Sequence, residues 1–90
     1  MNNKTKIKLT PEIKRQIALA EKYMETAKEI EKLIIDSGAK IDELAVAFSR
    51  DIASLGGLTT TAKDKNMAEE AASKHPEVKN ISNGVIILKS

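Results

Sequence analysis

The feature that most constrains this chain is a long amphipathic stretch, residues 10–38, with the sequence TPEIKRQIALAEKYMETAKEIEKLIIDSG. Thr10 can cap the free N–H groups of a first helical turn, and Pro11 suits the first helical position, where no N–H donor is needed. Gly38 can adopt the left-handed conformation that ends a helix. The stretch therefore predicts one helix, roughly 39 Å long at a rise of about 1.5 Å per residue.

Apolar residues recur along this helix at alternating intervals of four and three, the spacing of a coiled-coil seam. The seam consists of Ile13, Ile17, Ala20, Met24 and Ala27. A compact chain of this size has a radius of gyration of about 12 Å, so the helix should extend beyond its own core and expose the seam. Exposed apolar stripes of this kind usually bind a partner. We therefore expect the chain to form a homodimer through the seam; the alternative is that Leu58 and the C-terminal elements cover it.

Two further helices are expected after Gly38. The first spans residues 41–55, because apolar side chains there lie at helical spacing: Ile41, Leu44, Ala45, Phe48, Ile52 and Leu55. Gly56 and Gly57 would end it. The second spans residues 61–75, with small and apolar side chains facing inward, and Pro76 disfavours helical geometry at His75.

The C-terminal residues 77–89 predict a β-hairpin. Asn83-Gly84 is the favoured pair for a turn in which both residues need positive φ, and it separates residues 78–81 from the apolar run at residues 85–88. Residues 6–9 alternate polar and apolar side chains and would add an edge strand, giving a three-stranded sheet. Residues 1–5 are expected to form a disordered arm. The predicted fold is α+β: a single domain over residues 1–90, with three helices and a C-terminal hairpin.

Composition narrows the class of protein. Ninety residues suffice for one small core, and the net charge of +2 neither requires nor excludes nucleic acid. With no cysteine there is no disulfide framework and no thiolate zinc site. The sequence shows no run of membrane-spanning length and no signal peptide, so we expect a cytoplasmic protein without a membrane partner.

The sequence offers little for catalysis. His75 is the one histidine, and a Ser/His/Asp set would have to be assembled from it with Ser49 or Ser73 and Asp51. Scattered carboxylates on amphipathic faces are typical of solvated charge, not of a metal site. Gly56-Gly57 lacks the lysine spacing of a phosphate-binding loop. We expect no catalytic, metal or cofactor-binding residues and no small-molecule site.

The predicted order of helix, helix, helix and hairpin resembles that of winged-helix DNA-binding domains. In that family the third helix enters the major groove and the hairpin forms the wing. The resemblance implies nucleic-acid contacts by lysines on the third helix and the hairpin: Lys63, Lys65, Lys74, Lys79 and Lys89. This chain departs from the family because the third helix carries Glu69 and Glu70 and no arginine, the usual reader of guanine.

A second resemblance covers residues 27–88. The pattern of a helix, then ELA-x-x-x-S-x-D, then Gly-Gly, with GVIILK as a closing strand, is similar to the parvulin-type prolyl isomerases. The family's N-terminal strand with its histidine and its aromatic proline pocket are missing, so we interpret the similarity as coincidental. The preferred hypothesis is a small non-enzymatic regulatory or inhibitory protein, of the kind encoded by mobile elements, that acts through protein–protein contacts. The alternative is a dimeric winged-helix transcription regulator.

Overall fold

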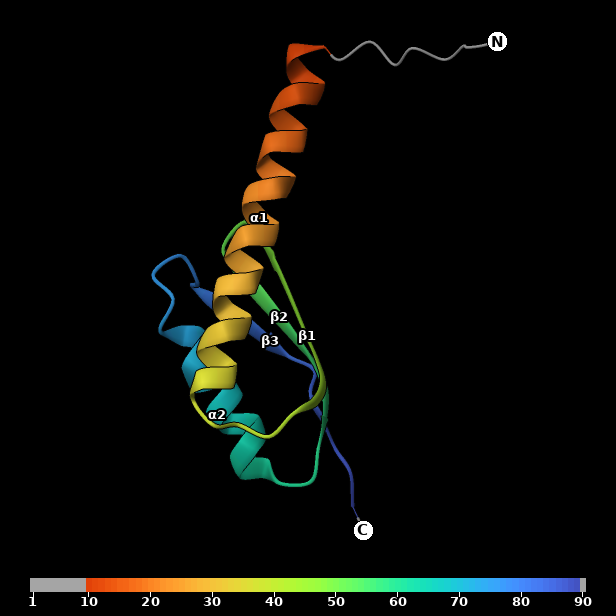
Figure 1. The fold of residues 1–90 in the computed structure, drawn as a ribbon, viewed down its shortest axis with the longest axis vertical. Helices are drawn as coiled ribbons and strands as arrows, with labels where there is room; N and C mark the ends of the chain where they lie inside the picture. The colour runs from red at the N-terminus through yellow and green to blue at the C-terminus, as the bar shows by residue number, and fades with distance from the viewer. Residues whose placement is uncertain (1–9, 90) are drawn as a thin grey trace, which may run out of the picture.

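The computed structural model describes residues 10–89 (Figure 1). In chain order the elements are α1 (Pro11–Asp36), β1 (Asp42–Ser49), β2 (Ile52–Thr59), α2 (Ala62–Ser73), β3 (Asn80–Asn83) and β4 (Ile86–Ile87). These residues thus form two helices and a four-stranded mixed sheet, an α+β fold. The expectation of three helices and a C-terminal hairpin is wrong. The arm and edge strand expected within residues 1–9 lie outside the described residues.

The long helix is present as α1, and local capping fixes both of its ends. The Thr10 hydroxyl accepts a hydrogen bond from the Ile13 N–H at 3.1 Å, which satisfies one free donor of the first turn. At the other end the Ser37 hydroxyl donates to the Ile34 carbonyl at 2.6 Å, and Gly38 has a φ of +87°. These are the terminal residues that the sequence indicated.

The helix expected over residues 41–55 is instead the antiparallel strand pair β1–β2. Side chains on β1 alternate, with Leu44, Val46 and Phe48 turned toward the helices and their neighbours exposed. The strands are joined by a two-residue turn, Arg50 and Asp51, which is flanked by the pair Ser49 and Ile52. Arg50 has a φ of 60°. The apolar residues of this segment fit both a period of 3.6 and a period of 2. The strand arrangement buries Phe48 against the helices, in the core of the fold.

The prediction of a C-terminal hairpin is also wrong, because β3 and β4 pair with β2 and not with each other. Both run parallel to β2 in one continuous register, with Asn83 opposite Leu55 and Ile86 opposite Leu58. Between them the Gly84 N–H donates to the Leu55 carbonyl at 2.8 Å. The crossover through α2 makes this parallel pairing possible. Asn83-Gly84 therefore lies along a strand, and Gly84 does not have positive φ.

A β-bulge distorts the start of β1. Two residues, Glu43 and Leu44, lie opposite the single Gly57, since Asp42 pairs with Leu58 and Ala45 with Gly56. Glu43 takes a φ of 53° and Gly57 a φ of 138°. A Cβ added at Gly57 would lie 2.6 Å from Ile41 Cγ2 and 2.9 Å from the Asp42 carbonyl oxygen. Only glycine fits at this position.

The helices pack against the sheet, and α1 crosses in front of the strands in Figure 1. The core between the layers is mostly aliphatic and consists of Ile30, Ile34, Phe48, Ala53, Leu55, Ala68, Ala71, Ala72 and Val85. The buried alanines of α2 allow it to approach α1 closely. At the end of the sheet nearest the N-terminal half of α1, Tyr23 meets Phe48 edge to face, with ring centroids 5.7 Å apart.

The N-terminal half of α1 extends beyond the sheet (Figure 1). The longest dimension of the structure is 56 Å, and its radius of gyration is 16.9 Å. A compact fold of this length would have a radius of gyration of about 12 Å. The difference arises from the projecting helix, so the part of the seam that it carries is not covered by the sheet.

Candidate protein-binding surfaces

The seam of α1 remains exposed over most of its length. Ile17 is 45% exposed and Met24 61% exposed, and Ala20 between them is also exposed. Ile13 is half-buried. Ala27 packs against the core and is therefore engaged within the fold. The available seam is Ile13, Ile17, Ala20 and Met24, which we call the α1 seam from here on.

The α1 seam is a different surface from the side of the helix that faces the sheet. The buried line of α1 runs through Thr26, Ile30 and Ile34. At 3.6 residues per turn, the centre of the α1 seam lies about 110° around the helix from this line. One side of α1 therefore builds the core, and a second apolar side is free along the projecting half.

Polar residues border the α1 seam in a regular pattern. On one side Lys14, Glu21 and Lys28 follow one another at seven-residue intervals, all of them exposed. On the other side lie Gln16, which is exposed, and Tyr23, which is half-buried against Phe48. A central apolar line with charged residues beside it is the arrangement by which helices select a partner helix.

The uncovered face of the sheet is a second accessible surface. Most of its exposed side chains are small or apolar: Ala45, Ala47, Ile52, Ser54, Ser82 and Ile86. The exposed Asp42 and Asn80 share this face, because they pair with Leu58 and Ile52. Ile52 is 42% exposed and Ile86 57% exposed. Sequence reasoning missed this face because residues 41–55 were assigned to a helix. The alternation of large and small side chains along Val46–Ala47–Phe48 was the sequence signal for a strand with one uncovered face.

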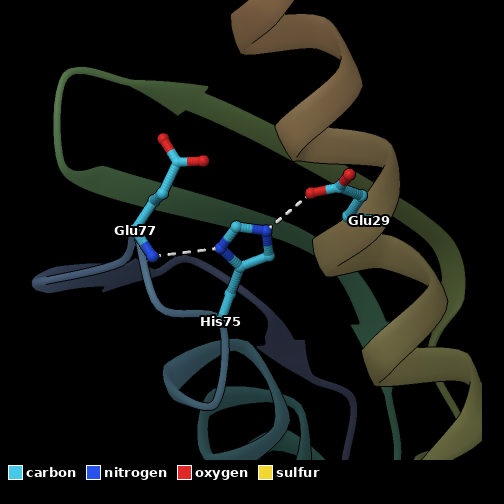
Figure 2. Close-up of polar contacts among 3 residues, drawn as sticks. All are labelled: Glu29, His75 and Glu77. Carbon is cyan, nitrogen blue, oxygen red and sulfur yellow. Dashed lines mark hydrogen bonds and ion pairs between the residues drawn. The ribbon is translucent and has the colours of Figure 1, made fainter.

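His75 joins α1 to the end of α2, as Figure 2 shows. Its ring is buried, at 7% exposure, and both ring nitrogens have partners. The Glu77 N–H donates to Nδ1 at 3.1 Å, and Nε2 lies 2.7 Å from a carboxylate oxygen of Glu29. Because Nδ1 accepts a hydrogen bond, the neutral ring carries its proton on Nε2 and donates it to Glu29.

This geometry gives His75 a structural role. The hydroxyl of Ser73 donates to the Glu70 carbonyl at 2.6 Å, and the Asp51 carbonyl accepts the Lys79 N–H at 2.9 Å. The His75 ring forms hydrogen bonds with Glu29 and Glu77. Its partners are therefore not the serine and aspartate of the Ser/His/Asp set considered in the sequence. No local sequence signal linked Glu29 to a histidine 46 residues away. The expected absence of catalysis and of cofactors stays a prediction.

Asp64 fixes the start of α2 to the segment before β1. The Thr61 hydroxyl donates to the Asp64 carboxylate at 2.6 Å, and the Lys40 N–H donates to it at 3.1 Å. The Thr61 hydroxyl bond, followed by the Lys40 bond, lowers the pKa of the Asp64 carboxyl from its ordinary value of 3.8. Among residues 10–89 no group of three or more histidine, aspartate or glutamate side chains is arranged to hold a metal ion.

The lysines proposed as nucleic-acid contacts are dispersed. Lys63 and Lys65 lie in the first turn of α2, whereas Lys74 follows its last residue, about 17 Å from Lys63 and about 14 Å from Lys65 along the helix axis. Lys79 precedes β3, and Lys89 follows β4. The second helix and the hairpin wing of the winged-helix order are absent from residues 10–89, so the resemblance to that family loses its structural basis.

Neither helix of the described residues is long and apolar enough to cross a membrane. We found no family model that matches the chain and no curated protein that matches its sequence. The fold is similar to two solved structures of CdsD, described as a structural protein of the type III secretion system of Chlamydia trachomatis.

The first CdsD structure superposes with a TM-score of 0.63 and 17% identity, over 76% of this chain and 32% of that chain. The second, of the C-terminal domain, gives a TM-score of 0.60 and 18% identity, over 73% of this chain and 33% of that chain. This chain thus spans about a third of the length of each structure. Identity at this level shows a shared fold alone.

Proposed function

We propose that the chain is a non-enzymatic protein-binding domain that self-associates through the α1 seam as part of a larger protein assembly. The observation that carries this proposal is the exposure of Ile17 and Met24 on a helix that projects past its own sheet. Water-exposed apolar surface of this kind gains free energy when a partner covers it. A second copy of the same helix supplies a matching seam.

The fold comparison supports an assembly role. The similar structures belong to a protein described as a structural protein of a secretion system, which favours a role in protein–protein contacts. The narrower role expected from the sequence, a regulator or inhibitor of another protein, stays a prediction. The pattern of hydrogen bonds around His75 agrees with a structural role for the only histidine.

Mutual capture tests the proposal. A tagged copy of the chain, immobilised on beads, is expected to retain an untagged copy, and Ile17→Glu in both copies is expected to abolish retention. Ala18→Glu is the matched control, because it adds the same charge one residue away at an exposed position outside the α1 seam. Equal retention of the wild type and Ile17→Glu would contradict the proposal, as would no retention of the wild type.

A further inference from the structure

We infer that two copies of α1 pair antiparallel, about a two-fold axis that passes between Ala18 and Leu19. Ile13 then packs against Met24 of the second copy, and Ile17 packs against Ala20 of the second copy. This inference rests on the proposed function and adds the orientation and register of the partner. The occupant of the α1 seam is a second copy of this chain.

The spacing of the α1 seam suits this arrangement. Its four residues lie at intervals of four, three and four, which read the same in both directions along the helix. An antiparallel copy therefore brings all four residues into contact at once. The α1 seam ends where α1 starts to contact the rest of the fold, because Tyr23 already contacts Phe48 and Ala27 packs against the core.

The bordering charges select the antiparallel orientation. In an antiparallel pair, residues of the same flank face each other, so Lys14 meets Glu21 of the second copy and Glu21 meets Lys14 of the second copy. Two opposite-charge pairs result from one two-fold axis. In a parallel pair the facing flanks would be different ones, and Glu21 would meet the uncharged Gln16. Lys14 and Glu21 thus form opposite-charge pairs across the α1 seam only when the helices run in opposite directions.

The position of the sheet agrees with this orientation. Sheet and α2 lie beside the C-terminal half of α1, and the α1 seam occupies the projecting half (Figure 1). Antiparallel pairing places the two folded bodies at opposite ends of a shared pair of helices. Neither body then has to contact the other, and both uncovered sheet faces stay accessible.

Disulfide trapping tests the orientation, and the absence of cysteine from the chain provides a clean background. In the antiparallel pair, position 24 of one copy lies about 16 Å along the axis from position 24 of the other, too far for a disulfide. A dimer of Met24→Cys chains alone is therefore expected to form no disulfide between its two chains under mild oxidation. A mixture of Ile13→Cys and Met24→Cys chains is expected to form the mixed disulfide. Each variant is first shown to dimerise by sedimentation.

A charge exchange provides an independent readout. Lys14→Glu is expected to raise the dissociation constant of the dimer roughly 2- to 30-fold, the range for two exposed ion pairs. The double variant Lys14→Glu/Glu21→Lys restores both pairs and is expected to recover the wild-type constant. A disulfide in Met24→Cys alone, or no recovery in the double variant, would overturn the antiparallel arrangement while leaving self-association intact. A wild-type chain that stays monomeric would instead overturn the proposed function.

Discussion

The side-chain amide of Asn83 donates a hydrogen bond to the Lys65 carbonyl of α2 at 3.0 Å. The same amide nitrogen lies 3.2 Å from a Glu69 carboxylate oxygen, and the amide oxygen accepts the Val85 N–H at 3.2 Å. One side chain therefore fixes the end of β3 to the helix and orients the chain into β4. This network replaces the hairpin turn that the Asn-Gly pair indicated.

Asn83→Asp is expected to lower the free energy of unfolding by about 1–3 kcal/mol. The substitution keeps the shape of the side chain but turns its two N–H donors into an acceptor that faces a carbonyl and a carboxylate. Urea denaturation followed by circular dichroism measures the change. Asn80→Asp is the control, because Asn80 is exposed in the same strand and is expected to change stability by less than about 0.5 kcal/mol. Equal effects of the two substitutions would disprove the role assigned to Asn83.

Gly57→Ala is expected to destabilise the fold by more than about 2 kcal/mol, or to prevent folding. The residue has a φ of 138°, and the added Cβ would clash with Ile41 and the backbone of Asp42 at the β-bulge. The neighbouring Gly56→Ala is the matched control. Its Cβ would meet only Ala45 Cβ, at 3.9 Å, which is ordinary contact. Thermal unfolding midpoints that shift alike for both variants would show that the bulge is wrongly placed.

Neutral His75 is expected to carry its proton on Nε2. The Glu77 N–H occupies Nδ1 as an acceptor, and the Glu29 carboxylate lies 2.7 Å from Nε2. Long-range ¹H–¹⁵N correlation spectra of the ring at alkaline pH distinguish the two tautomers. Detection of the tautomer protonated at Nδ1 would contradict this contact. Glu29→Gln keeps an acceptor oxygen for Nε2 and is expected to leave the tautomer unchanged.

The Asp64 carboxylate is expected to make stability depend on pH in the acid range. Because its pKa is lower in the folded chain than its ordinary value of 3.8, the stabilisation is fully present above that value. It is lost as the pH falls through the lower folded pKa. The difference in unfolding free energy between the wild type and Asp64→Asn should therefore shrink as the pH is lowered from about 6 to about 2. A difference that stays constant over this range would contradict the assignment.

The sequence predicted α1 correctly because its signals are local. Thr10, Pro11 and Gly38 act within one turn of the residues they cap, and no distant partner is needed to place the ends. Residues 41–55 lack such signals. Their apolar residues fit a helix and a strand pair equally, and the turn at Arg50 uses a non-glycine residue with positive φ, which turn statistics do not favour. Only the burial of Phe48 and Leu55 between two layers decides the outcome.

In the C-terminal strands a local sequence signal is present but misleading. Asn83-Gly84 is a strong local signal for a turn, but long-range pairing with β2 outweighs it. For the candidate site, the sequence placed Ile17 and Met24 on one apolar line. It did not separate that line from the buried line of α1, so the predicted seam includes Ala27, which packs against the core. The contact between Glu29 and His75 depends on tertiary structure alone.

Sedimentation equilibrium of the wild-type chain over a wide concentration range tests self-association through α1 most directly. We expect a mass that rises from one chain to two as concentration increases, and a single-chain mass at all concentrations for Ile17→Glu. A wild-type chain that remains monomeric to about 1 mM, the limit of weak association, would contradict self-association through α1, as would Ile17→Glu dimerising as tightly as the wild type.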